Sequence, residues 1–177
     1  MIMETITLPH LHQHSLHAIL FQNLSNASFL RQQLLEGNTD FEYAFLDASV
    51  LFSRSQVLAA CFRAINDQLQ RRMKSKNVHS EIVFSLSPNN NISESFRRFG
   101  VSETTKDLLA IKVGGGELGP TQVEQHLRQH VEGTPVPFTD DKLAEMRDEA
   151  RLRKVYKLDS VDDAEAYVLG SMALKGS

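Results

Sequence analysis

The sequence of 177 residues contains a single cysteine, Cys61, and no tryptophan. One cysteine cannot form an internal disulfide, so a disulfide-stapled scaffold is excluded and a reducing compartment is expected. No apolar run approaches the ~18 residues that cross a membrane, and the first residues lack the charged-then-apolar pattern of a secretory signal. We therefore expect a protein of the nucleus and cytoplasm that has no membrane partner.

The chain also has no excess of basic charge, because 19 Lys and Arg residues face 22 Asp and Glu residues, for a net charge of -3. This balance disfavours a generally basic nucleic-acid binder but is compatible with a local basic patch. The hydrophobic fraction of 41% and the charged fraction of 23% are ordinary for a globular fold. A chain of this length can bury a core without staples, and we expect a single domain over residues 1–177.

Apolar periodicities typical of strands and of helices alternate along the chain. Strands are predicted at His14–Phe21, Tyr43–Ala48, Glu81–Leu86 and Asp107–Val113, and helices at Asn26–Leu35, Ser55–Lys74, Thr121–Val131, Thr139–Tyr156 and Val161–Leu174. Within the long second helix, the predicted buried stripe is Leu58, Cys61, Phe62, Ile65 and Leu69. The fold class is α/β, with one mixed β-sheet packed against helices and a helical C-terminus.

One glycine-rich loop has the spacing of a dinucleotide-binding turn. Residues Gly114–Gly119 spell GxGxxG between a predicted strand and helix, with Asp140 about twenty residues downstream. Such glycines let a backbone approach a pyrophosphate. Here Glu117 would place a negative charge beside the phosphates, and the loop follows the last predicted strand rather than the first. A surface loop is the better interpretation.

Histidine and cysteine chemistry is no better supported. Two histidine groups have spacings that could bind a metal: His10, His12 and His14 in an extended segment, and His126 with His130 on a helix. No acidic or thiol partner completes either group locally, so solvated histidines are expected. Cys61 lies on an apolar stripe with no neighbouring base, which predicts a buried structural thiol. We predict no catalytic residue, no metal site and no cofactor.

The segment Leu86–Gly100, with the sequence LSPNNNISESFRRFG, is the most informative part of the chain. It predicts a strand end, a turn and a short helix. Asn91 can cap this helix, and Glu94 can reach back to the backbone of the cap. Gly100 would end the helix in a left-handed conformation. No residue in the segment is an obvious nucleophile or metal ligand, which favours a shaped surface over an enzyme.

The same segment resembles the signature of the kinase-binding subunit family of the KEOPS/EKC complex, also called the PRPK-binding protein family. A second matching segment is Asp148–Leu158, DEARLRKVYKL, and a weaker match covers Ala44–Asp47. The resemblance implies a non-catalytic subunit that binds and regulates a small atypical kinase/ATPase, and through it the other KEOPS subunits. It also implies recruitment of tRNA, including its 3′ end, for threonylcarbamoyladenosine modification, and a link to telomere maintenance.

Two candidate surfaces follow. Basic residues that could hold tRNA are Arg63, Arg71, Arg72, Lys74, Lys76, Arg97 and Arg98. The alternative is that they only solvate helix ends. Residues of the last two helices that could dock the kinase are Leu152, Val155, Tyr156, Val168, Leu169 and Met172. The alternative there is that both helix faces are buried internally. As a whole, a free-standing RNA-binding module and a small nucleotide-dependent enzyme remain the competing functions.

Overall fold

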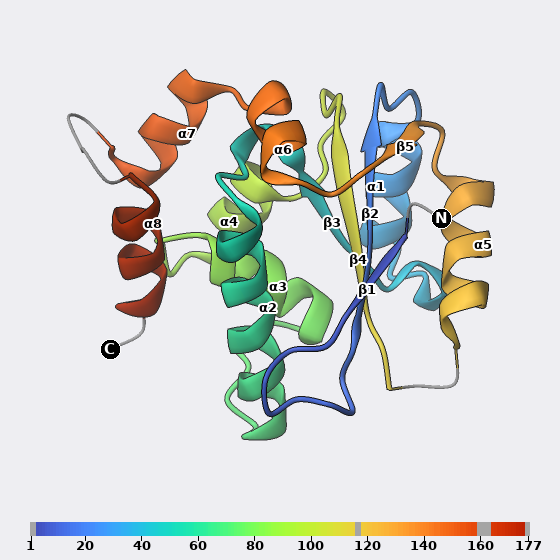
Figure 1. Ribbon diagram of the computed structural model, residues 1–177, viewed down its shortest axis with the longest axis horizontal. Coiled ribbons are helices and arrows are strands. Elements are labelled where there is room, and N and C mark those ends of the chain that lie inside the picture. The colour runs from blue at the N-terminus through green and yellow to red at the C-terminus, as the bar shows by residue number, and fades with distance from the viewer. Residues whose placement is uncertain (1–2, 116–117, 159–163, 176–177) are drawn as a thin grey trace.

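The computed structural model describes residues 3–115, 118–158 and 164–175 (Figure 1). Its centre is a β-sheet with the strands β1 (Glu4–Ile6), β2 (Leu16–Gln22), β3 (Ala44–Asp47), β4 (Leu108–Val113) and β5 (Thr134–Val136). The strand order is β1-β2-β4-β3, and β5 pairs with β2. β1 and β5 meet different ends of β2: β1 pairs with Leu16–Ala18 and β5 with Leu20–Gln22.

Each pair of neighbouring strands in the described sheet is antiparallel, so the predicted mixed sheet is wrong in this respect. The strands β2 and β3 run in the same direction, since both are antiparallel to β4. They do not pair because β4 lies between them. The layered α/β class with a helical C-terminal part is confirmed.

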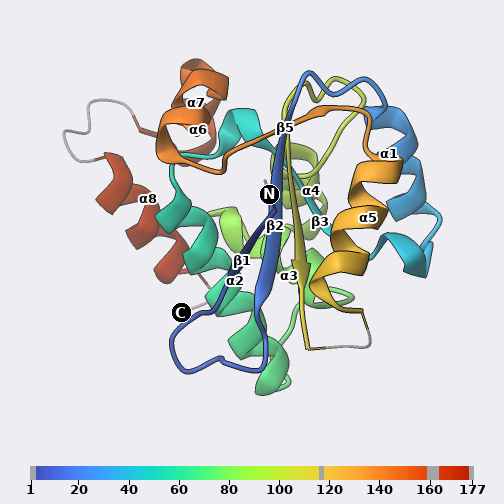
Figure 2. The same ribbon diagram turned by 45° about the vertical axis from the view of Figure 1, so that its right-hand side comes forward.

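Side chains of the central strands alternate between two cores, one on each face of the sheet. On β4, Leu109 and Ile111 belong to the larger core, whereas Leu108 and Ala110 belong to the smaller one. The smaller core is covered by α1 (Ala27–Leu35) and α5 (Pro120–His130). The larger core is covered by the remaining helices, which are α2 (Arg54–Leu69), α3 (Val78–Leu86), α4 (Ile92–Phe99), α6 (Asp140–Met146), α7 (Glu149–Tyr156) and α8 (Ala164–Ala173). Figures 1 and 2 show these two groups of helices on opposite sides of the sheet.

The predicted strand Glu81–Leu86 is wrong, because these residues form the greater part of helix α3. The helix starts with a capping box: the Asn77 side chain accepts the Ser80 backbone N–H, and the Ser80 hydroxyl accepts the Asn77 backbone N–H, both at 2.9 Å. All helical residues of α3 except Ser80 are buried. A segment buried on every side shows no polar face, so its period cannot be read from its sequence.

The predicted helix Thr139–Tyr156 is two helices, α6 and α7, which are separated at Arg147 and Asp148. The Asp148 carboxylate caps α7 by accepting the Arg151 backbone N–H at 3.2 Å. The Arg147 guanidinium donates to the Phe52 carbonyl at 2.6 Å and lies 4.7 Å over the Phe52 ring. These contacts with a distant segment break a helix that local pattern alone would continue.

The long helix α2 ends at Leu69 rather than at the predicted Lys74. Arg71 has a φ of 58°, which is a left-handed conformation that cannot continue the helix. The predicted stripe of α2 is also partly wrong: Cys61 and Ile65 are buried, but Phe62 is 39% exposed and Leu69 51% exposed. The last predicted helix begins before the described part, since residues 161–163 lie outside the described residues and α8 begins at Ala164.

Candidate functional site

The two segments that carry the family resemblance meet in three dimensions. The Arg151 guanidinium donates to the Arg98 carbonyl at 3.3 Å, and the Tyr156 hydroxyl donates to the Leu86 carbonyl at 2.5 Å. The rings of Phe99 and Tyr156 pack edge to face, with centroids 5.7 Å apart. The contacts therefore join α7 to both ends of the segment Leu86–Gly100, and the signature residues hold the fold together.

The third resembling segment ends at Asp47, whose carboxylate lies at the centre of a polar network. It is 3% exposed and accepts hydrogen bonds from the backbone and hydroxyl of Ser49, from the Thr105 hydroxyl and from the Arg151 guanidinium, at 2.6–3.2 Å. Four donors satisfy a buried carboxylate, so the charge can stay buried without a ligand. We call Asp47, Ser49, Thr105, Arg151 and Tyr156 the signature network.

Helix α4 starts as predicted but ends differently. The Asn91 side chain accepts the Glu94 backbone N–H at 3.0 Å, which confirms the cap. The Glu94 carboxylate pairs with Arg97 at 2.6 Å and Arg98 at 3.1 Å, instead of reaching back to the cap. The predicted left-handed Gly100 is wrong, because its φ is -79°. A Cβ at Gly100 would lie 2.8 Å from the Phe96 carbonyl oxygen, so glycine serves close packing there.

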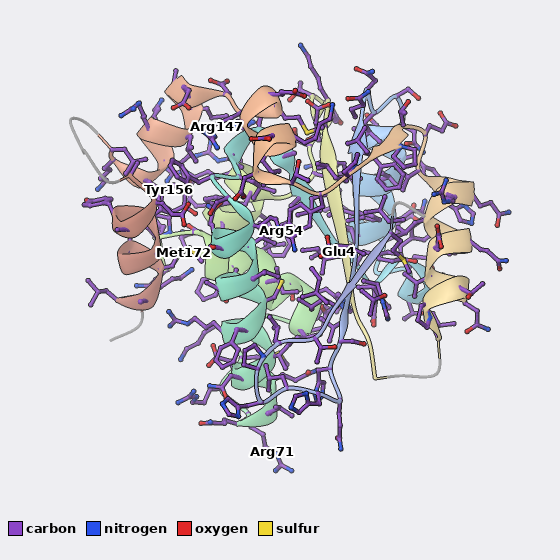
Figure 3. All side chains as sticks on the ribbon, in the orientation of Figure 1. Glu4, Arg54, Arg71, Arg147, Tyr156 and Met172 are labelled. Atoms are coloured by element: carbon purple, nitrogen blue, oxygen red, sulfur yellow. The ribbon has the colours of Figure 1, made fainter. Side chains whose placement is uncertain are left out.

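The residues predicted to contact a kinase lie mostly inside the larger core. Leu152, Val155, Tyr156, Val168 and Met172 are each between 0% and 6% exposed, and only Leu169 is partly exposed. Tyr156 also accepts a hydrogen bond from the Gln56 amide at 2.7 Å. Figure 3 shows Tyr156 and Met172 by label. In this conformation the five buried side chains cannot form a docking surface. For these five residues the alternative, burial within the protein, is the observed arrangement. Exposed apolar side chains occur nearby instead, at Phe62 and Leu69 on α2 and at Tyr167 on α8.

The predicted tRNA-contacting residues divide into two groups. Several are used within the chain: Arg63 donates to the Met172 and Lys175 carbonyls, Arg72 pairs with Asp67, and Arg97 and Arg98 pair with Glu94. Arg63 therefore fastens α8 to α2. Arg71 projects outward at the lower end of the molecule in Figure 3. Lys74 and Lys76 are exposed, and neither ammonium group has an ion-pair partner among the described residues.

Lys74, Lys76 and Arg97 line a cavity with a volume of about 820 Å³. We call it the edge groove, because its floor includes Tyr43 and Phe45 at β3, the end strand of the sheet. One wall comes from α1 and the other from α3 and α4. The apolar side chains that line it include Leu34, Phe41, Val83, Ile92, Phe96 and Val101.

Cations border this apolar floor. Arg31, Lys74, Lys76 and Arg97 all line the groove, and the Lys76 ammonium would lie 3.5 Å from a Cβ placed at Gly37. A groove with apolar and aromatic side chains and a basic border has the composition of surfaces that bind single-stranded nucleic acid. The sequence pointed to Lys74, Lys76 and Arg97, but it missed Arg31 and the floor, which come from distant segments.

A smaller cavity of about 390 Å³ lies next to the edge groove and shares Glu42, Asn77 and His79 with it. Lys112 lines the smaller cavity; its ammonium donates to the Glu42 carbonyl at 2.7 Å, and burial lowers its pKa. Burial lowers the pKa of His79 to about 3, with a further decrease caused by Lys112, so this imidazole is neutral at physiological pH. No local pattern in the sequence marks this junction.

The glycine loop, Asp140 and Cys61, which suggested enzymatic functions, are each explained by their places in the fold. Gly114 and Gly115 pack against the segment before β2, where a Cβ would come within 2.9 Å of the Ser15 hydroxyl and 2.5 Å of the Gln13 carbonyl; Gly116 and Glu117 lie outside the described residues. Asp140 begins α6. Cys61 is fully buried, which raises its thiol pKa to about 12.

The described histidines take part in contacts within the protein and not in a metal-binding cluster. His126 accepts from or donates to the Tyr43 hydroxyl at 2.7 Å and packs against His130, with ring centroids 4.5 Å apart. Within residues 3–115, 118–158 and 164–175, no three His, Cys, Asp or Glu side chains gather as metal ligands would. None of the helices in these ranges has the length and apolarity needed to cross a membrane.

Comparison with known proteins gives a consistent result. The family model described as kinase binding protein CGI-121 matches residues 21–176. The chain is similar to the EKC/KEOPS complex subunit cgi121 of Aspergillus fumigatus, at 51% identity over 99% of this chain and 97% of the relative. It is also similar to the subunits of the same name from Gibberella zeae, at 41% identity over 99% and 100%, and from Schizosaccharomyces pombe, at 35% over 96% and 98%.

Proposed function

The chain belongs to the kinase binding protein CGI-121 family, and we propose that it acts as a non-catalytic subunit of an EKC/KEOPS complex. In this function it binds and regulates the small kinase/ATPase subunit and helps to recruit tRNA for threonylcarbamoyladenosine modification. The observation that carries the proposal is the match over residues 21–176, together with relatives of that name that cover nearly the whole chain. A location in nucleus and cytoplasm and a link to telomere maintenance enter the proposal through family membership only.

For the kinase, we place the docking surface on the outer sides of α2 and α8. These helices lie side by side in both views, and Arg63 fastens one to the other (Figures 1 and 2). Phe62 and Leu69 on α2 and Tyr167 on α8 are 39%, 51% and 44% exposed. Large apolar side chains are costly to leave in water, and such residues dominate the binding energy of protein interfaces.

Gel filtration of the chain mixed with the kinase subunit tests this surface. We expect co-elution in high salt for the wild type, and separate elution for Phe62→Glu and for Leu69→Glu, because a carboxylate cannot be buried in an apolar interface. Leu35→Glu is the matched control, since Leu35 is 64% exposed on α1, across the sheet from α2. Separate elution of the wild type at micromolar concentration would overturn kinase binding. Co-elution of both α2 variants would overturn this location.

For tRNA, the edge groove is the site that we favour. It combines an aromatic and aliphatic floor with four cations, and two of them, Lys74 and Lys76, are without ion-pair partners in the part of the chain that the structure describes. Stacking of unpaired bases is worth about 1–3 kcal/mol per base, so a single-stranded end is a better ligand for such a groove than a duplex. The single-stranded 3′ end of tRNA fits this requirement.

Binding of tRNA with and without its single-stranded 3′ end tests the groove. We expect the intact tRNA to bind more tightly, and the preference to be lost when Lys74 and Lys76 are both replaced by Ala. The matched control replaces Lys154 and Lys157, which are exposed at α7, by Ala. Equal binding of both tRNAs by the wild type would exclude the groove as the site of the 3′ end.

A free-standing RNA-binding module is the second candidate function, favoured by the groove alone. It predicts the same tRNA affinity with and without the kinase, and no salt-resistant complex in gel filtration. The gel filtration described above therefore separates the candidates.

A further inference from the structure

The chain directly after α8 places a lysine inside the protein. Lys175 is 6% exposed; its side-chain nitrogen donates to the Phe84 carbonyl on α3 and lies 3.4 Å over the centre of the Phe84 ring. Of the residues of α8 itself, only Val168 and Met172 are buried. A helix that buries so little apolar surface is held weakly, so the state of this one lysine strongly affects whether α8 stays in place.

The charges that face Lys175 do not compensate its own charge. On α2, the Arg63 guanidinium donates to the Lys175 carbonyl and brings a second cation close, while Asp67 pairs with Arg63 at 3.8 Å. On α3, the buried Glu81 carboxylate accepts hydrogen bonds from the loop between α2 and α3, at 2.8–3.1 Å. Among the described residues, no carboxylate forms an ion pair with the Lys175 side chain. Burial, followed by the nearby Arg63 cation, lowers the pKa of Lys175 to about 7, against a smaller increase caused by Glu81.

These surroundings favour the neutral amine over the ammonium ion. A neutral amine still donates to the Phe84 carbonyl and needs no opposite charge, whereas the carbonyl and the ring replace only part of the water around an ammonium ion. When α8 opens, Lys175 returns to water, where its pKa is about 10.5. Between pH 7 and 10.5, closing α8 therefore releases a proton, and the closed state becomes more stable as the pH rises.

We propose that Lys175 is a positioning residue for the kinase-docking surface: as a neutral amine it holds α8 on α2 and α3, and on protonation it loosens α8. Tyr167 belongs to α8, so opening of the helix separates it from Phe62 and Leu69 on α2. Kinase binding then weakens as the pH falls toward 7. The effect on the kinase rests on the proposed function, whereas the movement of α8 is a property of this chain alone.

Hydrogen exchange of the α8 amides in the isolated chain tests the movement, after correction for the intrinsic pH dependence of exchange. For the wild type, we expect the equilibrium constant for opening to decrease by more than about tenfold between pH 7 and 9, because closing releases close to one proton. Equal opening of wild-type α8 at both pH values would overturn the inference.

Two substitutions separate the neutral amine from the charge. Lys175→Met cannot be protonated, so α8 should be protected at least as well as in the wild type at pH 7, with no response to pH. The Phe84 carbonyl keeps the Ser87 backbone N–H at 3.2 Å in this variant, so it is not left unpaired. Lys175→Arg stays charged throughout this range, so α8 should open more and also lose its response to pH. Wild-type protection in Lys175→Arg would show that the charge holds the helix, and would overturn the inference.

The matched control is Lys154→Met, at an exposed position on α7, which should keep the wild-type response to pH. Kinase affinity measured from pH 7 to 8.5 then tests the role in docking. It should increase with pH for the wild type and stay constant for Lys175→Met. Equal responses of these two proteins would overturn the role of Lys175 in docking. Absence of kinase binding at every pH would overturn the proposed function and this role with it, even where α8 responds to pH as expected.

Discussion

The signature network and the edge groove lie on either side of α4 and differ in whether their polar groups have partners within the protein. In the network, the Asp47 carboxylate receives four hydrogen bonds, and the Tyr156 hydroxyl both donates and accepts. In the groove, Lys74 and Lys76 lack ion-pair partners within the described residues. Paired polar groups stabilise the fold, whereas unpaired ones are available to a ligand. Substitutions in the signature network should therefore lower the free energy of unfolding more than substitutions in the edge groove.

The largest loss of stability is expected for Asp47→Ala. Removing this buried acceptor leaves the donors of Ser49, Thr105 and Arg151 without it, and breaking a buried pair in this way costs about 3–5 kcal/mol. Chemical denaturation measures the difference. Glu149→Ala is the control, since that carboxylate is 58% exposed and its loss should cost under about 1 kcal/mol. Equal effects of the two variants would contradict a structural role for the network.

Tyr156→Phe should cost less, because it keeps the buried ring and removes one hydroxyl. The Gln56 amide and the Leu86 carbonyl each lose a partner in a buried place, for a total of about 1–3 kcal/mol. Denaturation midpoints measure this, and kinase co-elution should persist in the folded variant. A loss of co-elution at unchanged stability would instead return Tyr156 to the docking surface.

His79 lines the edge groove, and its contribution to stability should depend on pH. Its pKa is about 3 in the folded state and about 6.5 in the unfolded chain, so the unfolded chain binds the proton first as the pH falls. This contribution to stability is present above pH 6.5 and decreases between pH 6.5 and 3, by up to roughly 1.4 kcal/mol per pH unit. His79→Gln, which can still accept from Val113, should flatten this part of the profile. His12→Gln, at an exposed position, should not.

The smallest change in stability is expected for the double substitution of Lys74 and Lys76 by Ala. Exposed cations without ion-pair partners contribute little, so unfolding should shift by no more than about 0.5 kcal/mol. The salt dependence of RNA binding should weaken, with the slope of log K against log salt decreasing by about 1.4 if each lysine contacts one phosphate of a single strand. A stability loss like that of Asp47→Ala would show that these lysines support the fold.

Most of the fold could be predicted from local pattern, and the exceptions have tertiary causes. The strands β2, β3 and β4 and the helices α1 and α5 follow the predicted ranges closely. Helix α3 was mistaken for a strand because burial on all sides removes its polar face. The break between α6 and α7 depends on Arg147 meeting Phe52, a contact 95 residues apart in the chain.

The site was harder to predict than the fold. Lys74, Lys76 and Arg97 were found as local basic runs, but Arg31, Glu42 and Lys112 stand in unremarkable surroundings and meet only in the folded chain. The buried face of α2 was predicted partly wrong for a different reason. Ala60 and Ala64 fill the buried side, so the larger Phe62 and Leu69 face outward. A hydrophobic stripe shows which residues are apolar but not which side of the helix the core takes.

The close packing at Gly100 has a consequence for solubility. β3 ends the sheet, and an end strand offers free backbone groups to which another chain can add. Gly100 forms a bridge with Leu46, and the Val101 backbone N–H donates to the Phe45 carbonyl at 2.9 Å, so this short segment shields part of the strand. A side chain at residue 100 would push against the Phe96 carbonyl and lift the segment away. The resulting defect would be self-association through β3, in a chain whose binding residues are all intact.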